Sequence, residues 1–155
     1  MTKIVNQRTD FDCSIAVYAM WLNKPYEEIE DKALNHGVFP KAGSGMTDAM
    51  EDKLGKLFGM DIVRLCCWTG LTGLLAVPSL NFKTTHAIFY KDEKLYDPQT
   101  GRDEKLWYPE TTERFPCYRN IAIDLNNDYD REMFEMAVGM DMKKLKDFKK
   151  KKDMG

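Results

Sequence analysis

The spacing of apolar residues changes at Gly59, and this change limits the folds open to the chain. Before Gly59, apolar residues recur with the period of a helix. After it, short segments rich in β-branched and aromatic residues are separated by turn formers. Helices therefore come first and strands second, without the alternation of strand and helix that builds a parallel sheet. The sequence predicts an α+β fold, with N-terminal helices followed by an antiparallel sheet.

Three helices are predicted in the first half of the chain. The first covers residues 13–22, and Asp12 stands directly before it as a candidate N-cap. The second covers residues 25–35, because proline suits the first turn of a helix. The third is capped by Thr47 and ends at Gly59, since glycine readily adopts the left-handed conformation that closes a helix.

Five strands are predicted in the second half of the chain. They cover residues 61–68, 74–80, 85–90, 94–98 and 118–125. The polar segment 91–94 separates the third strand from the fourth and has the composition of a hairpin turn. From about Asp128 the pattern is helical again. We therefore expect one domain over residues 1–127, and a C-terminal helix with a lysine-rich tail over residues 128–155.

The composition describes an ordinary globular protein with a core of its own. The chain has 155 residues, of which 43% are apolar, and its formal net charge of −2 is too small to indicate a class of partner. No apolar run is long enough to span a bilayer, and no export signal precedes the first predicted helix. We therefore expect a cytoplasmic protein without a membrane segment.

The four cysteines are Cys13, Cys66, Cys67 and Cys117. In a cytoplasmic protein they are expected to be reduced thiols. Cys66 and Cys67 are adjacent, so in a strand their side chains point to opposite faces of the sheet. No two cysteines have the spacing of about two to four residues that is typical of a zinc site. We expect neither a bound metal nor a cofactor.

Basic charge is concentrated near the C-terminal end. Residues 143–153 contain seven lysines and two aspartates, which leaves the rest of the chain acidic. Such a tail is suited to an acidic partner or to nucleic acid, and a solvated terminus without a partner is the alternative. Before the tail, four methionines are expected to form a helix face that packs on the domain. They are Met133, Met136, Met140 and Met142.

A thiol hydrolase requires a nucleophilic cysteine, an imidazole base and a third group that orients the imidazole. The chain has two histidines, His36 and His86. His36 lies at the predicted C-terminal end of a helix, where the helix dipole favours a histidine for structural reasons. His86 opens a predicted strand, and Asp97 lies in the hairpin partner of that strand, so the hairpin brings the two together. The alternative is a strand histidine and a turn aspartate without a shared role.

Cys13 is the candidate nucleophile because it lies at the start of a predicted apolar helix. Backbone N–H groups and the helix dipole favour the thiolate form of a cysteine at such a position, and a neighbouring imidazolium favours it further. The alternative is a small buried residue that happens to begin a helix. The other three cysteines have only a structural interpretation.

Gln7 lies six residues before Cys13, in the segment QRTDFDC, and completes a pattern with the later His86 and the segment DPQTG. This pattern resembles the bacteriocin-processing, double-glycine-leader peptidases of the papain-like superfamily. The resemblance covers roughly residues 4–125 and makes the predicted domain a papain-like thiol hydrolase domain. It implies a papain-like cysteine peptidase fold and four functional residues: Gln7 as oxyanion-hole donor, Cys13 as nucleophile, His86 as base and Asp97 as orienting group.

The resemblance implies a soluble cysteine peptidase, or a related amide hydrolase, that acts on a peptide or protein substrate. Two alternatives remain open. The same triad can deamidate a partner protein or transfer an acyl group, and a protein that only binds or inhibits can keep the fold without the chemistry. Ser14 follows Cys13 where the family usually has glycine, and this departure favours the last alternative.

Overall fold

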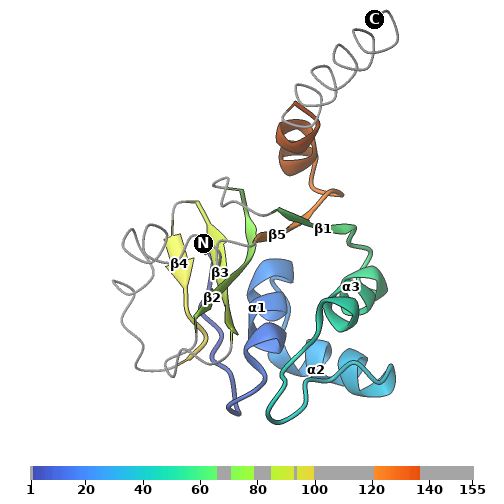
Figure 1. Cartoon of the computed structure of the whole chain (residues 1–155), viewed down its shortest axis with the longest axis vertical. Coiled ribbons are helices and arrows are strands. Elements are labelled where there is room, and N and C mark those ends of the chain that lie inside the picture. Colours follow the sequence, from blue (N-terminus) through green and yellow to red (C-terminus); the bar gives the residue numbers. More distant parts are fainter. Residues whose placement is uncertain (1, 66–70, 79–84, 93, 100–120, 137–155) are drawn as a thin grey trace, which may run out of the picture.

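The computed structural model describes residues 2–65, 71–78, 85–92, 94–99 and 121–136. The first three helices are α1 (Cys13–Leu22), α2 (Tyr26–Asn35) and α3 (Asp48–Leu57). The strands are β1 (Ile62–Leu65), β2 (Gly73–Pro78), β3 (Thr85–Lys91), β4 (Lys94–Tyr96) and β5 (Ile121–Asp124). Residues 128–136 form a further helix. Helices come first and the sheet follows, so the predicted α+β class is confirmed (Figure 1).

The described strands form one antiparallel sheet in the order β1-β5-β2-β3-β4. β5 pairs with both β1 and β2, so the end of the domain is inserted between two strands that come much earlier in the chain. This insertion joins the part of the sheet next to α3 to the part next to α1. The insertion of β5 depends on contacts between segments far apart in sequence, so no local pattern predicts it.

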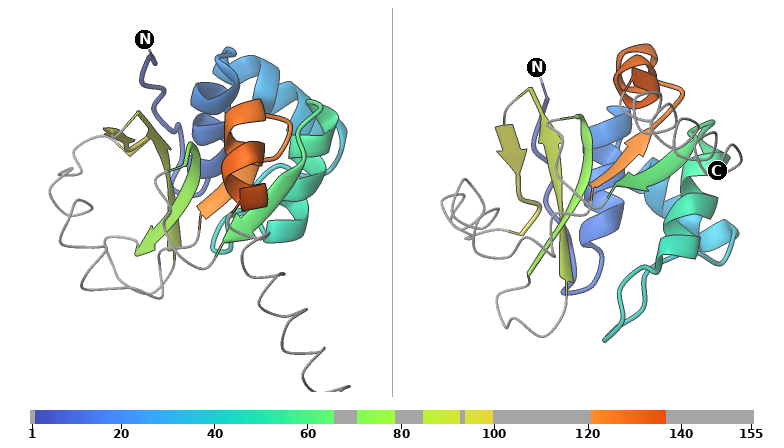
Figure 2. Two further views of the ribbon diagram at one scale, coloured as in Figure 1. Left: turned by 90° about the horizontal axis from the view of Figure 1, so that it is seen from above. Right: turned by 45° about the horizontal axis from the view of Figure 1, so that its top comes forward.

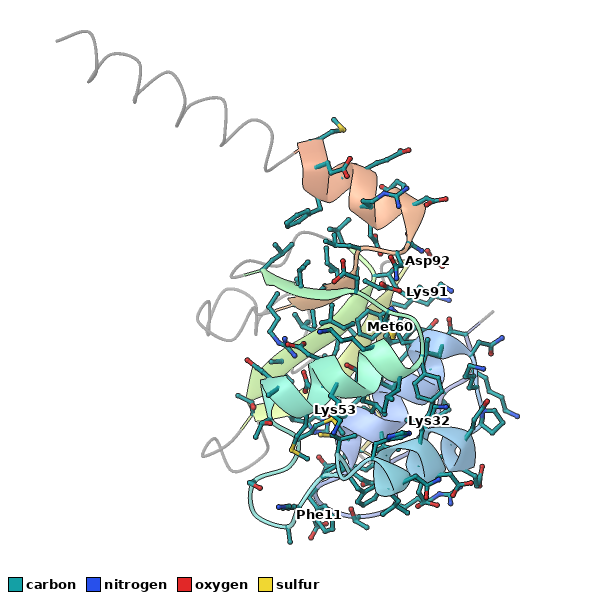
Figure 3. The ribbon with its side chains drawn as sticks, turned by 90° about the vertical axis from the view of Figure 1, so that its right-hand side faces the viewer. Phe11, Lys32, Lys53, Met60, Lys91 and Asp92 are labelled. Carbon is teal, nitrogen blue, oxygen red and sulfur yellow. The ribbon has the colours of Figure 1, made fainter. Side chains whose placement is uncertain are left out.

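The β3–β4 hairpin forms where the sequence predicts a turn. Lys91 pairs with Lys94, and the turn that follows Lys91 begins with Asp92. Asp92 has a φ of 51°, a left-handed conformation that aspartate tolerates better than most residues. Figure 3 shows Lys91 and Asp92 well away from Phe11, which lies just before α1. The tip of the hairpin is therefore remote from the start of α1.

The three N-terminal helices pack on one face of the sheet (Figure 2). α1 contacts β2 and β3 on one side and α2 on the other, and every residue from Ser14 to Met20 is buried. A helix with neighbours on all sides has no solvent face, which explains why this segment is apolar all round. The core on this side includes Tyr18, Ile29, Leu54 and Phe89.

The opposite face of the sheet has a second apolar cluster, because alternate strand residues point to opposite faces. It includes Leu75, Val77, Ile88, Tyr90, Ile121 and Ile123. Phe134, from the helix over residues 128–136, packs against this cluster. The start of the C-terminal segment thus belongs to the packed structure.

Phe134, and not the methionines, makes the contact of this C-terminal helix with the sheet. Met133 and Met136 are 41% and 65% exposed, so the predicted methionine packing face is wrong for these two residues. Met140, Met142 and the lysine-rich tail lie outside the described residues. In the part of the chain that the structure describes, no helix combines the length and apolar character needed to cross a bilayer.

The helix ends agree with the sequence at four places, although one of them lacks the capping hydrogen bond. The Thr47 hydroxyl accepts a hydrogen bond from the Met50 N–H at 3.2 Å, as an N-cap should. Gly59 has a φ of 75° after the end of α3, and His36 is the C-cap of α2. Asp12 is the N-cap residue of α1, as the sequence predicts, but its carboxylate makes no capping hydrogen bond to this helix. The position of the N-cap is therefore confirmed, whereas the side-chain bond that usually accompanies it is absent.

Candidate active site

Cys13 is the first residue of α1, and its side chain is partly exposed. The helix begins here because the Asp12 carbonyl accepts hydrogen bonds from the N–H groups of Ile15 at 3.0 Å and Ala16 at 3.4 Å. The packing of α1 between the sheet and α2 holds this end in place. The thiol therefore lies at the positive end of a fixed helix dipole.

His86 and Asp97 form a buried pair. The distance from His86 Nε2 to Asp97 Oδ1 is 2.7 Å, and the two residues are 6% and 7% exposed. His86 is the second residue of β3 and Asp97 directly follows β4, so the hairpin between these strands brings them together. The Gln99 N–H donates to the same Asp97 Oδ1 at 2.9 Å and helps to fix the carboxylate.

Opposing effects act on the protonation of His86. Burial lowers the pKa of the imidazole, whereas hydrogen bonds to Asp97 and Cys13 and the charges of both groups raise it. The net pKa of His86 is raised above its usual value. Since Nε2 faces Asp97, Nδ1 is the ring nitrogen that remains for the Cys13 thiol. The arrangement favours an imidazolium held between the Asp97 carboxylate and the Cys13 side chain.

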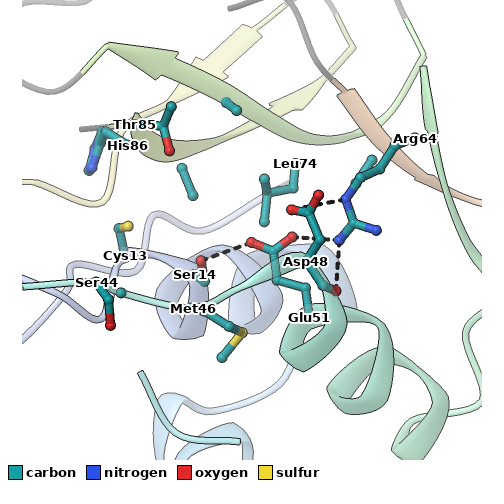
Figure 4. Close-up of a pocket in the computed structure, with 14 residues that line it drawn as sticks. Cys13, Ser14, Ser44, Met46, Asp48, Glu51, Arg64, Leu74, Thr85 and His86 are labelled. Atoms are coloured by element: carbon teal, nitrogen blue, oxygen red, sulfur yellow. Dashed lines mark hydrogen bonds and ion pairs between the residues drawn. The ribbon is translucent and has the colours of Figure 1, made fainter. Parts of the chain in front are cut away.

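A cavity of about 270 Å³ reaches Cys13 and His86 (Figure 4). Its walls come from the start of α1, the loop over residues 44–46, the first turn of α3 and the sheet. Figure 4 shows the Cys13 sulfur and the His86 ring on the same side of this cavity. A molecule that enters the cavity therefore meets both groups.

The far end of the cavity carries a charged network. The Ser14 hydroxyl donates to Glu51 Oε1 at 3.4 Å, and Arg64 Nη2 donates to Glu51 Oε2 at 2.8 Å. Arg64 Nη1 also donates to Asp52 Oδ1 at 2.6 Å, and Arg64 Nε lies 3.4 Å from Asp48 Oδ1. Figure 4 shows the part of this network formed by Ser14, Asp48, Glu51 and Arg64, across the cavity from His86. Arg64 thus links β1 to the N-terminal half of α3 through three carboxylates.

Glu51 is the most buried of these three carboxylates, with 7% of the residue exposed. Burial raises its pKa, and the hydrogen bond and charge of Arg64 oppose this effect without cancelling it, so the pKa of Glu51 is about 7. An unfolded glutamate titrates near 4.5. The folded protein therefore holds a proton on Glu51 over a pH range in which the unfolded chain has lost it.

This difference predicts that stability falls as pH rises from about 5 to 8. In that range the unfolded chain binds fewer protons than the folded one, so the free energy of unfolding decreases with pH, by about 2–3 kcal/mol in total. Glu51→Gln keeps an acceptor for Ser14 and should remove this part of the pH dependence. The free energy of urea unfolding, compared at pH 5 and pH 8, measures this decrease.

Asp52→Asn is the control, because Asp52 also pairs with Arg64 but is half exposed. The interpretation fails when Glu51→Gln retains the full decrease.

Gln7 is attached to the segment that carries Asp97. Its backbone N–H donates to the Pro98 carbonyl at 2.8 Å. Its side-chain Nε2 donates to the Thr9 carbonyl at 2.8 Å, and its Oε1 is buried and has no partner among the described residues. One amide hydrogen is therefore used inside the loop between Gln7 and Cys13, and the second has no partner among the described residues. Gln7 is not among the residues that line the cavity.

Comparison with known proteins relates the fold to one known architecture. No protein-family model and no curated protein matches the chain. Its structure is similar to the peptidase domain of Streptococcus ComA, a bi-functional ABC transporter involved in a quorum sensing pathway, with a TM-score of 0.53 and 13% sequence identity. The similarity covers 80% of this chain and 98% of that domain. The chain has the fold of this peptidase domain. The papain-like resemblance of the sequence is thus confirmed for the fold.

Sequence reasoning missed the charged end of the cavity. Glu51 and Arg64 come from α3 and β1, and Ser14 meets Glu51 across 37 residues of sequence. An acidic helix face followed by an arginine in a strand is also what an ordinary surface shows, so no local signal marks these residues. Cys66, Cys67 and Cys117 lie outside the described residues.

Proposed function

We propose that the chain is a thiol hydrolase that cleaves an amide bond in a peptide or protein substrate. Cys13 is the nucleophile, His86 the base and Asp97 the group that orients the imidazole. The observation that carries the proposal is the buried His86–Asp97 pair, with 2.7 Å between Nε2 and Oδ1, beside a thiol at a helix start and a cavity wall. A buried pair of this kind is well suited to keep one imidazole face directed at a nucleophile.

The proposed reaction has two steps. The Cys13 thiolate attacks the substrate carbonyl carbon, and the imidazolium of His86 gives its proton to the leaving nitrogen as the C–N bond breaks. This leaves a thioester on Cys13 and neutral imidazole. His86 then takes a proton from a water molecule, whose oxygen attacks the thioester carbon; the C–S bond breaks, the carboxylic acid product leaves, and the Cys13 thiolate and His86 imidazolium are restored. Asp97 stabilises the imidazolium whenever it forms, without accepting its proton.

Gln7 is the proposed oxyanion donor, together with the Cys13 backbone N–H. The side-chain amide has one hydrogen bonded to Thr9, so the other is available to a developing oxyanion. A donor of this type contributes roughly 3–4 kcal/mol to the transition state. Substrate entry is expected to bring Gln7 and the carbonyl oxygen together at the edge of the cavity near Cys13.

A peptide substrate and a cytoplasmic location are parts of the same proposal. The structural neighbour is a peptidase domain, which supports a peptide as the substrate class. A catalytic thiol must stay reduced, and the cytoplasm is the compartment that keeps it so. The lysine-rich segment 143–153 remains a candidate contact for an acidic partner or nucleic acid.

Cys13 is expected to be the most reactive thiol of the chain. An imidazolium and a helix dipole both favour its thiolate, so a limiting amount of iodoacetamide should alkylate it first. Peptide mapping by mass spectrometry compares it with Cys66, Cys67 and Cys117, which serve as internal controls. Preferential labelling of Cys117 would rule out the assignment of Cys13.

The products decide between the possible reactions of the same triad. The protein and its Cys13→Ser variant can be incubated with a mixture of peptides of known sequence, and the products identified by mass spectrometry. We expect shortened peptides with wild type and none with the variant. Intact peptides in which glutamine has become glutamate indicate deamidation, and peptides that have gained an acyl group indicate transfer. A reactive Cys13 without any product would favour a binding protein.

A further inference from the structure

Asp12 is a buried carboxylate directly before the proposed nucleophile, and the mechanism above does not use it. It is fully buried, with 0% of the residue exposed. A buried carboxylate costs several kcal/mol of stability unless hydrogen bonds and partners compensate for it. A fold that keeps such a group beside its candidate nucleophile must satisfy it with specific donors.

Four groups donate to this carboxylate, and none belongs to the helix that Asp12 precedes. The Arg8 N–H donates to Oδ2 at 2.9 Å, and the Thr9 N–H and hydroxyl each donate to Oδ1 at 2.9 Å. The Tyr26 hydroxyl donates to Oδ2 at 2.5 Å. Burial raises the pKa of Asp12, but the hydrogen bonds from Tyr26, Arg8 and Thr9 outweigh it, so its pKa is lowered and the group is ionised at neutral pH.

These bonds close the loop between Gln7 and Cys13 on itself and attach it to α2. Tyr26 is the first residue of α2, so its hydroxyl bonds the loop to a second helix. The Arg8 guanidinium lies 4.0 Å from the centre of the Tyr26 ring and pairs with Glu27. The loop therefore contacts the first turn of α2 through two of its residues, Asp12 and Arg8.

The loop has a third attachment at its start. The Gln7 N–H donates to the carbonyl of Pro98, the residue after Asp97, at 2.8 Å. The segment from Gln7 to Cys13 is thus hydrogen-bonded at its first residue to the neighbour of Asp97. Its two ends carry the proposed oxyanion donor and the proposed nucleophile, and Asp12 is the charged group that its donors surround.

We propose that Asp12, with Tyr26 as its main partner, is a positioning residue that sets the place of Gln7 relative to Cys13. The inference rests on the proposed function, because it assigns Asp12 a role only through the oxyanion donor and the nucleophile. A positioning role differs from a merely structural one in which reactions of the Cys13 thiol it affects. Loss of the Asp12–Tyr26 bond should impair reactions that develop an oxyanion and leave other reactions of the thiol almost unchanged.

Two reagents separate these effects. Acylation of Cys13 by p-nitrophenyl acetate passes through a tetrahedral oxyanion, whereas alkylation by iodoacetamide is a direct displacement without one. We expect Tyr26→Phe and Asp12→Asn to lower the acylation rate about tenfold to a hundredfold, as small misplacements of catalytic groups do, and the alkylation rate by no more than about twofold. The ratio of the two rates is the measured quantity.

Tyr18→Phe is the matched control. Tyr18 is also a buried tyrosine, but its hydroxyl donates to the Glu51 carbonyl on α3, at 2.8 Å, and not to the loop between Gln7 and Cys13. Its loss should leave the ratio unchanged. Tyr26→Phe removes a single oxygen atom and keeps the test possible even where Asp12→Asn does not fold. In a Gln7→Ala background, Tyr26→Phe and Asp12→Asn should lower the acylation rate little further, because both act through Gln7.

The outcomes distinguish this inference from the function on which it rests. Equal acylation of wild type and Cys13→Ser would overturn the proposed function, and the role of Asp12 with it. Wild type that is acylated at Cys13, with Tyr26→Phe and Asp12→Asn showing an unchanged ratio or a parallel fall of both rates, would overturn the role of Asp12 alone.

Discussion

His86→Ala is expected to slow acylation of Cys13 by p-nitrophenyl acetate by about 10²–10⁴-fold, because the variant loses the group that holds the proton. The raised pKa of His86 means that its imidazolium persists to higher pH in the folded protein than in an unfolded chain. Without it, the Cys13 thiolate loses its counter-charge, so the rate below pH 7 should fall the most. Stopped-flow release of p-nitrophenol over pH 5.5–9 measures the effect.

The substitution also removes the partner of a buried carboxylate, so folding must be followed in parallel. Loss of the imidazolium partner of a buried carboxylate costs up to about 3–5 kcal/mol, less what the other interactions of Asp97, such as the hydrogen bond from the Gln99 N–H, retain. His86→Gln avoids this loss, because a glutamine amide can still donate to Asp97 but cannot accept a proton at neutral pH. A folded His86→Gln protein with a similar loss of rate would assign the effect to the missing base.

His36 provides the control. It is the exposed C-cap of α2, and its carbonyl accepts a hydrogen bond from Lys53 Nζ at 3.2 Å. A backbone contact survives a change of side chain, so His36→Ala should leave both the fold and the rate unchanged. Equal effects of His36→Ala and His86→Ala would remove the basis for choosing between the two histidines.

The parts of the candidate site that sequence could predict are those set by local geometry. His86 and Asp97 are 11 residues apart and lie on two strands of one hairpin, so alternation and a single turn bring them together. Cys13 begins an apolar helix, and the start of such a helix can be read from the polar segment before it. Each of these expectations needs only a short segment of chain.

The parts that sequence could not predict depend on distant contacts or on competing local ones. The insertion of β5 between β1 and β2 brings together residues about 60 apart, as in the pair Ile62–Asp124. The meeting of Ser14 with Glu51 and Arg64 follows from that arrangement. Asp12 has the sequence signature of an N-cap. Its carboxylate nevertheless accepts hydrogen bonds from the N–H groups of Arg8 and Thr9 and from the Tyr26 hydroxyl, and none from α1.

Asp97→Asn is the second substitution with a large expected effect, and it tests the triad as a unit. We expect the fold to survive. The amide oxygen of the substituted side chain can still accept from His86 Nε2 and from the Gln99 N–H, which lie 2.7 and 2.9 Å from the carboxylate oxygen that it replaces. What the variant loses is the negative charge that raises the pKa of His86.

The rate is therefore expected to fall by about 10²-fold, less than in Cys13→Ala or His86→Ala, because the base is still present but its imidazolium is less stabilised. The pH profile should also change. Loss of the charge lowers the pKa of His86, so the imidazolium that stabilises the Cys13 thiolate is lost at a lower pH. The acylation rate should then depend more steeply on pH around neutrality. Acylation rates across the pH range, compared with thermal melts of the same samples, measure both effects.

Asp92→Asn is the matched control for this substitution. Asp92 lies at the tip of the same hairpin, in a left-handed conformation that asparagine also adopts, so the change should alter neither rate nor stability. A double variant, Asp97→Asn with His86→Ala, should be hardly slower than His86→Ala alone, because an orienting group has no effect without the ring that it orients. Additive losses in the double variant, or equal effects of Asp92→Asn and Asp97→Asn, would reduce the proposed triad to a dyad of Cys13 and His86.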